Sequence, residues 1–228
     1  MIHQKGSTLI IVLIVLLLVT IIGTIAVKSS ILGLGIATNN QVNALLLENS
    51  DAALFNLENP STVERQLATD GMYGYFNSSA NASDELIFCY RAAETNFFSI
   101  QKSSAITTSG SITKIGTAGF CKASSFATGR RAVLSQVYLT KATTTSSPFA
   151  SVPKGSSLGQ GSIAASSMTI GATVVSVLPS FAAASSASIE ACFKRRASLV
   201  GACFADLNIP YNIQHSDFTV GGQPKLVS

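Results

Sequence analysis

Three parts of the chain hold residue types that could form the catalytic triad of a serine hydrolase. Residues 155–159, Gly-Ser-Ser-Leu-Gly, match the G-x-S-x-G turn that exposes a nucleophilic serine, and Asp206 and His215 follow in α/β-hydrolase order. That turn needs a strand before the serine and a helix after it. Here the pentapeptide lies in a tract of Ser, Thr, Gly and Ala, where chance matches are frequent. We therefore expect no catalytic residue and no enzymatic activity.

Four cysteines, Cys89, Cys121, Cys192 and Cys203, are the next candidates for chemistry. They lack the C-x-x-C spacing of a zinc site and have no histidine near them, so we expect neither a metal nor another cofactor. All four lie beyond the apolar segment described below, in even number, as in proteins of oxidising compartments. Four cysteines permit three pairings; the short separation of Cys192 and Cys203 favours a bridge between them, which leaves Cys89 with Cys121.

The basic residues are few for a nucleic-acid-binding protein. Only 11% of the 228 residues are charged, and the formal net charge is +4, which gives a weak electrostatic field. The runs 130–131 and 194–196 could contact phosphates, but sites for nucleic acids usually gather more charge and aromatic stacking. We interpret both runs as solvated surface, so nucleic acid is the less favoured partner.

The elements that would carry these residues begin with an apolar segment at the N-terminus. Residues 9–27 contain no charge and lie between Lys5 and Lys28. Their length matches the roughly 20 residues that cross about 30 Å of hydrocarbon as a helix. A cleavable secretory signal is the alternative, but its apolar part would be only about 7–15 residues long. The segment is therefore predicted to span a membrane once.

The helical pattern continues beyond the apolar segment, because the next proline is Pro60. An amphipathic stripe follows on one side of the helix. It comprises Ile31, Leu34, Gly35, Thr38, Val42, Leu45, Leu46, Asn49, Ala52 and Ala53. We expect one helix over residues 7–58, about 75 Å long at 1.5 Å per residue, with its second half against a globular domain.

Residues 5–10, Lys-Gly-Ser-Thr-Leu-Ile, resemble the processing site of type IV pilins, and the segments 39–44 and 49–54 resemble the N-terminal module of minor pilins of the PilX type. The resemblance covers residues 1–58. It implies that a prepilin peptidase cuts after Gly6, which removes the leader 1–6, and that the new terminus, Ser7, is N-methylated.

Two positions depart from the common pilin pattern. Ser7 stands where the first mature residue is usually Phe, and Ile11 stands where the fifth is usually Glu. In the family that carboxylate is thought to pair with the terminal amine of a neighbouring subunit, because an unpaired charge in apolar surroundings costs several kcal/mol. The first subunit of a fibre has no such neighbour. Ile11 therefore fits a subunit that primes assembly and stays at or near the fibre tip; a subunit incorporated at random is the alternative.

Residues 59–228 are predicted to form a periplasmic or extracellular globular domain. Strand patterns occur at 85–91, 97–102, 111–115, 130–141 and 168–178, a helix pattern at 188–200, a connector at 61–81 and an extended tail at 204–228. Residues 142–167 read as an exposed Ser/Gly-rich insertion. The predicted fold class is α+β: a long N-terminal helix packed on an antiparallel sheet, as in type IV pilins, with disulfides.

The function that this resemblance implies is structural: a minor pilin that primes pilus assembly and contributes to adhesion, twitching motility or DNA uptake. The implied partners are other minor pilins, the major pilin, the inner-membrane assembly platform, the prepilin peptidase and, before assembly, the lipid bilayer. Two alternatives remain open. One is a membrane-anchored periplasmic enzyme or binding protein whose N-terminus is never cut; the other is a minor pseudopilin of type II secretion, which shares every residue used above.

Overall fold

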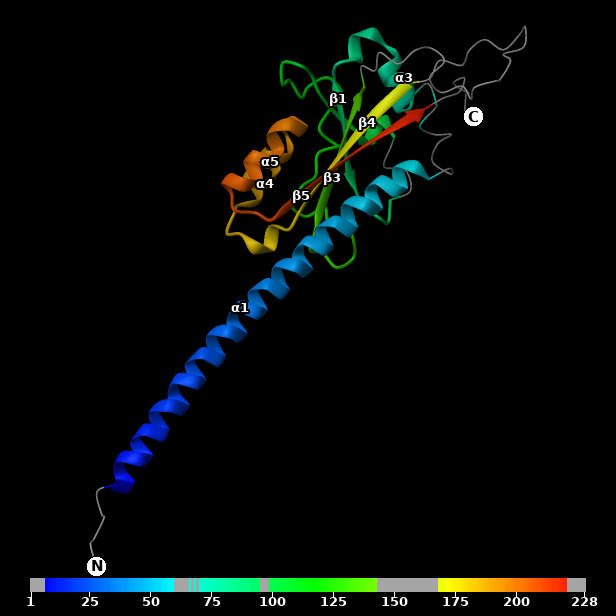
Figure 1. Ribbon diagram of the computed structural model, residues 1–228. Helices are drawn as coiled ribbons and strands as arrows, with labels where there is room; N and C mark the ends of the chain where they lie inside the picture. The colour runs from blue at the N-terminus through cyan, green and yellow to red at the C-terminus, as the bar shows by residue number, and fades with distance from the viewer. Residues whose placement is uncertain are drawn as a thin grey trace, which may run out of the picture. The chain divides into compact units, whose positions relative to one another are not determined.

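The structure is a computed structural model that describes residues 7–59, 66, 68, 70–94, 99–142 and 168–220. The chain divides into two compact units, Met1–Asn43 and Ala44–Ser228. One helix, α1 (Ser7–Glu58), runs from the first unit into the second without interruption (Figure 1). The long N-terminal helix of the predicted fold class is therefore present.

The second unit is built on a five-stranded antiparallel sheet in the order β2-β1-β3-β4-β5. Its strands are β1 (Glu85–Tyr90), β2 (Ser104–Ile106), β3 (Leu134–Lys141), β4 (Met168–Val177) and β5 (Tyr211–Val220). The predictions for β1 and β4 are confirmed. The longest register joins β4 to β5 over ten residue pairs, from Met168 opposite Val220 to Val177 opposite Tyr211.

Both faces of the sheet are covered, because side chains alternate between them along each strand. Leu86 and Phe88 of β1 belong to a core shared with Ala53 and Leu57 at the C-terminal end of α1. Ile87, between them, belongs to a second core with α4 (Ser186–Phe193) and α5 (Ala197–Asp206). The second unit thus has three layers: the end of α1, the sheet, and the α4–α5 pair (Figure 1).

The strands predicted at 97–102 and 111–115 are wrong in the described part of the chain. Residues 100–102 form a 3-10 turn, closed by the Ser103 hydroxyl donating to the Ile100 carbonyl oxygen at 2.7 Å, and β2 follows it. Residues 111–115 form turns between Gly110 and Gly116, which have φ of 84° and 130°. Glycine reaches this left-handed region without the steric cost that other residues meet. The predicted strand 130–141 begins only at Leu134, since Arg131 also has positive φ.

The single helix predicted at 188–200 is two helices. Helix α4 begins after Ser185, whose hydroxyl accepts the Ser188 N–H at 3.1 Å as an N-cap, and it ends at Phe193. Helix α5 begins at Ala197, whose N–H donates to a Glu85 carboxylate oxygen at 2.9 Å. A side chain from β1 therefore satisfies the first turn of α5, which local sequence does not reveal.

Two further predictions were incomplete. The predicted extended tail 204–228 begins with the last residues of α5 and contains β5, and the connector contains α3 (Met72–Asn77), with Met72 and Phe76 in the core of the α1 side. The predicted insertion 142–167 lies outside the described residues except for Ala142.

The amphipathic stripe of α1 is buried only at its C-terminal end. Leu46, Asn49 and Ala53 are buried, whereas Ile31 and Leu34 are 65% and 70% exposed. Periodicity identified the correct side of the helix in the second unit but extended it too far toward the N-terminus.

Candidate membrane-spanning helix and its attachment to the sheet

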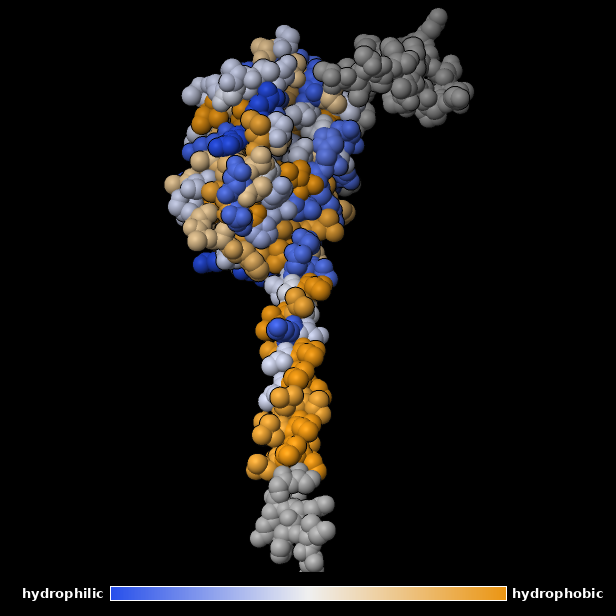
Figure 2. Space-filling model, turned by 60° about the vertical axis from the view of Figure 1, so that its left-hand side comes forward, coloured by the Kyte–Doolittle hydropathy of each residue, from blue (hydrophilic) through white to orange (hydrophobic). Residues whose placement is uncertain are grey.

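The first candidate site is the apolar part of α1, which is long and apolar enough to cross a membrane. Its large hydrophobic side chains are exposed from Leu9 onward, and Figure 2 shows apolar residues along the face of this segment in view. Exposure of so large a continuous apolar surface to water is unfavourable, whereas contact with lipid or with the apolar side of other helices is favourable. This segment therefore requires an apolar environment.

The polar groups of this segment are already satisfied within the helix. The hydroxyls of Thr20 and Thr24 donate to the carbonyl oxygens of Leu17 and Ile21, each at 2.8 Å. Hydrocarbon offers no hydrogen-bond partners, so a spanning helix must pair its own polar groups. In lipid, neither threonine would have an unsatisfied donor.

One of the two predicted processing residues lies at the start of this helix. Ser7 is the first residue of α1, and Gly6 lies outside the described residues. Ile11 is on the first turns of the helix and is 57% exposed, so the position usually occupied by Glu presents an apolar side chain to the surroundings.

A chain of buried hydroxyls fastens the C-terminal part of α1 to the sheet. Ser50 of α1 donates to Ser176 of β4 at 2.8 Å, and Ser176 lies 2.8 Å from the hydroxyl of Ser135 on β3. All three side chains are fully buried. These two hydrogen bonds fix the register of the helix on two strands, because apolar contacts alone have no direction.

The opposite face of the sheet is organised by the disulfides and by one buried amide. Cys89 is bonded to Cys121 and Cys192 to Cys203, the pairing that the spacing favoured. Gln136 of β3 accepts the Cys121 N–H at 2.8 Å and donates to the Phe193 carbonyl oxygen at 2.8 Å. It thereby joins the strand to one disulfide segment and to the end of α4.

Three tyrosines have pKa values above the ordinary range. Burial raises the pKa of Tyr138 well above its usual value, and its hydroxyl donates to the Phe193 carbonyl oxygen at 3.0 Å. Burial, together with a hydrogen bond to Asp84, raises the pKa of Tyr75. Burial also raises that of Tyr90. Asp84 is further paired with Lys114 at 2.5 Å, so this carboxylate is neutralised by a neighbouring cation.

The residues of the hydrolase pattern have other partners. His215 of β5 faces the Thr173 hydroxyl at 2.9 Å and Asp217 at 3.2 Å, and Asp206 is the last residue of α5. Residues 155–159 lie outside the described residues. In the described part of the chain, no group of three His, Cys, Asp or Glu side chains is placed to hold a metal ion.

Sequence reasoning missed Ser50, Ser135, Ser176 and Gln136, which connect the layers. The only signal for them is a polar residue at a position that strand or helix periodicity assigns to the interior.

No protein-family model, no curated protein and no solved structure matches this chain.

Proposed function

We propose that this chain is a minor pilin of the PilX type: a non-enzymatic subunit that primes assembly of a type IV pilus and remains near the fibre tip. The supporting observation is the continuous helix Ser7–Glu58. Its first part is apolar and exposed, and its last part is hydrogen-bonded to an antiparallel sheet. One element thus combines a membrane-compatible surface with a hydrogen-bonded attachment to a sheet.

In this proposal the helix moves from lipid to a protein environment, and both environments are apolar. Before assembly the segment from Leu9 onward lies in the inner membrane, with the second unit on the periplasmic side. During assembly it moves among the equivalent helices of other minor pilins and of the major pilin, driven by the assembly platform. Helices packed in a fibre core replace lipid contacts with side-chain contacts, so the apolar surface is covered in both states.

Ile11 supports the position at the tip. A subunit within the shaft has a neighbour whose terminal amine needs a carboxylate, whereas a subunit laid down first has none above it. An apolar residue at this position leaves no isolated charge in the fibre core. In the proposal the leader 1–6 is cut after Gly6 by a prepilin peptidase, and Ser7 becomes the methylated terminus.

The direct test is the intact mass of the chain purified from cells with an active prepilin peptidase. We expect the loss of residues 1–6 and the gain of one methyl group. Gly6→Val places a branched side chain at the cleavage position and is expected to leave the chain uncut. Gly23→Ala is the matched control, because a Cβ there meets nothing within 4 Å. Retention of Met1 in the unmodified sequence would contradict the proposal and support a permanently anchored enzyme or binding protein.

A second experiment separates priming from other roles. Deletion of the chain in its host is expected to reduce the number of surface fibres. Normal fibre numbers with altered attachment would point to a tip adhesin, and normal pili with a defect in protein secretion would point to a type II secretion pseudopilin.

A further inference from the structure

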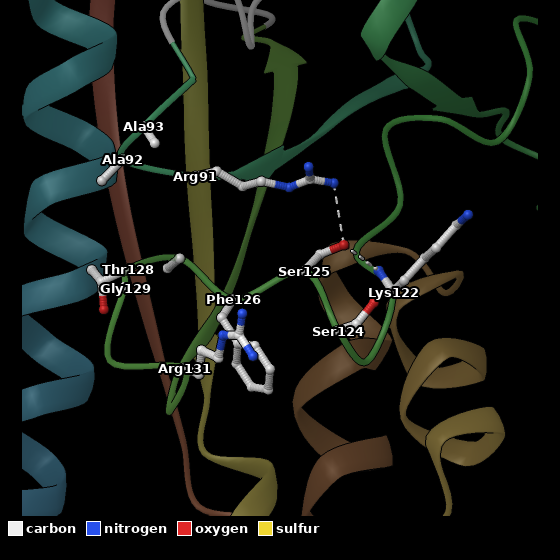
Figure 3. A pocket seen from close by; sticks show the side chains of 11 residues that line it. Arg91, Ala92, Ala93, Lys122, Ser124, Ser125, Phe126, Thr128, Gly129 and Arg131 are labelled. Carbon is white, nitrogen blue, oxygen red and sulfur yellow. Dashed lines mark hydrogen bonds between the residues drawn. The ribbon is translucent and has the colours of Figure 1, made fainter.

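The end of β1 and the loop from Lys122 to Arg131 line a pocket of about 670 Å³ that is open to solvent (Figure 3). Pockets for small ligands span about 300–1,000 Å³, so this one has room for a molecule the size of a monosaccharide derivative. We propose that it binds a sugar carrying a phosphate or sulfate group. The pocket lies outside the features used for the proposed function and does not depend on it.

The lining has an excess of positive charge. Arg91, Lys122 and Arg131 all contribute to the walls and are exposed. Within the described part of the chain, none of the three forms an ion pair with a carboxylate, and the nearby Glu94 is paired with Lys102. Positive charge that lacks an internal partner attracts an anion from solution.

The two arginines come from different walls. Arg91 extends from the end of β1 across the pocket, where its guanidinium donates to the Ser125 hydroxyl at 3.2 Å, and Arg131 comes from the opposing loop (Figure 3). Guanidinium groups bind tetrahedral oxyanions through paired, charge-assisted hydrogen bonds. The hydroxyls of Ser124 and Thr128 add polar groups to the same lining. This combination suits the oxygens of a phosphate or sulfate ester.

The walls are held in place before any ligand arrives. The Ala92 N–H donates to the Ala127 carbonyl oxygen at 2.8 Å, and the Ala127 N–H donates to that of Val133 at 2.8 Å. The loop begins next to the Cys89–Cys121 disulfide, and the Ala123 N–H donates to Glu190 of α4 at 3.0 Å. A preorganised pocket loses less conformational entropy on binding.

The remaining lining favours a sugar over a longer polyanion. Phe126 is half-buried and gives the pocket an aromatic wall, on which the apolar side of a sugar ring can pack. Nucleic-acid binding typically uses a longer track of about 6–10 phosphate contacts. The three cationic residues that line this pocket are too few for such a track.

The test is calorimetric titration of the full chain in detergent with glucose 6-phosphate, glucose 6-sulfate, inorganic phosphate and glucose. We expect saturable binding of both hexose esters, weaker binding of inorganic phosphate, and none of glucose. Replacing Arg91→Gln together with Arg131→Asn is expected to raise the Kd for the esters by about tenfold or more, because charge-assisted hydrogen bonds are lost. Asn is chosen at position 131 since it tolerates the φ of 50° there.

The matched control removes two positive charges elsewhere, Lys194→Gln with Arg195→Gln in the turn between α4 and α5, and is expected to leave the Kd unchanged. Equal weakening in both double variants would overturn the proposal, as would the absence of saturable binding in the unmodified chain. Displacement of the ester by a duplex oligonucleotide that binds more tightly would also overturn it in favour of nucleic acid. If the double variant does not fold, the same titration is made with Arg131→Asn alone. This side chain is exposed, so the single variant should fold, and a several-fold rise in the Kd for the esters is still expected.

Discussion

Replacing Ser176→Ala should cost more stability than replacing either of its hydroxyl partners. Ser176 is the middle member of the buried chain, 2.8 Å from Ser50 on one side and 2.8 Å from Ser135 on the other. Its removal breaks both hydrogen bonds at once. It also leaves the buried hydroxyls of Ser50 and Ser135 without these hydrogen bonds.

The magnitude follows from the fate of those two hydroxyls. Each neutral hydrogen bond contributes about 1 kcal/mol net, and a buried hydroxyl left unsatisfied costs about 1–3 kcal/mol. Ser50 can turn to a carbonyl oxygen of its own helix, as helical serines do, whereas Ser135 on a strand cannot. We expect Ser176→Ala to lower the free energy of unfolding by about 3 kcal/mol and Ser50→Ala by about 1 kcal/mol.

Replacing all three serines with alanine should cost less than Ser176→Ala alone. The triple variant loses the same two hydrogen bonds but leaves no buried hydroxyl unsatisfied, so its cost is expected to be about 2 kcal/mol. This inversion distinguishes unsatisfied polar groups from lost packing, since loss of packing would grow with each substitution.

The assay is urea unfolding of the full chain in detergent, followed by tyrosine fluorescence, which is unobstructed because the chain has no Trp. Ser109→Ala is the control: its hydroxyl is bonded to Thr107 at the surface, so we expect a change within about 0.5 kcal/mol. The reasoning is refuted if the triple variant is less stable than Ser176→Ala, or if Ser50→Ala and Ser176→Ala cost the same.

Three further predictions concern other parts of the second unit. Gly119→Ala should lower the free energy of unfolding by about 3 kcal/mol, because a Cβ would lie 2.2 Å from the Ile87 carbonyl oxygen; Gly129→Ala, with nothing within 4 Å, should change it little in the same urea assay. Burial raises the pKa of Tyr138 above the value that this residue has in the unfolded chain. The contribution of Tyr138 to the free energy of unfolding is therefore complete below about pH 10 and falls by about 1.4 kcal/mol per pH unit above it. In Tyr138→Phe the free energy of unfolding should fall less steeply between about pH 10 and 11, which is measured by comparing the urea midpoints at the two pH values. Replacing both cysteines of the Cys89–Cys121 pair with alanine should cost about 4 kcal/mol and the Cys192–Cys203 pair about 3 kcal/mol, because their separations are 32 and 11 residues; the reverse order in thermal melts would argue against loop entropy as the cause.

Local sequence was sufficient for the elements whose signal is local. The apolar segment 9–27 and the absence of a proline before Pro60 predict α1, since each residue of a helix bonds to one four positions away. Strands β1 and β4 are apolar and β-branched enough to be recognised by composition. The disulfide pairing followed from separation along the chain.

Elements held by distant partners were not visible locally. Strand β5 is a mainly polar segment that becomes a strand through its pairing with β4, more than 30 residues earlier in the chain. The start of α5 depends on Glu85 of β1, and the arginines of the proposed sugar-binding pocket come from β1 and from a loop about 40 residues later. The run at 130–131 was interpreted as solvated surface because it has few charges for a nucleic-acid site, and nothing in the sequence places Arg91 opposite it.

The sequence by itself therefore determined the long helix and its apolar surface and favoured the observed disulfide pairs, because periodicity, polarity and separation can be read along the chain. Only the tertiary structure decided how far along the helix this buried side extends, which serines connect it to the sheet and which cations share a pocket. Those features depend on contacts between residues far apart in the chain, and their geometry exists only after the sheet has formed.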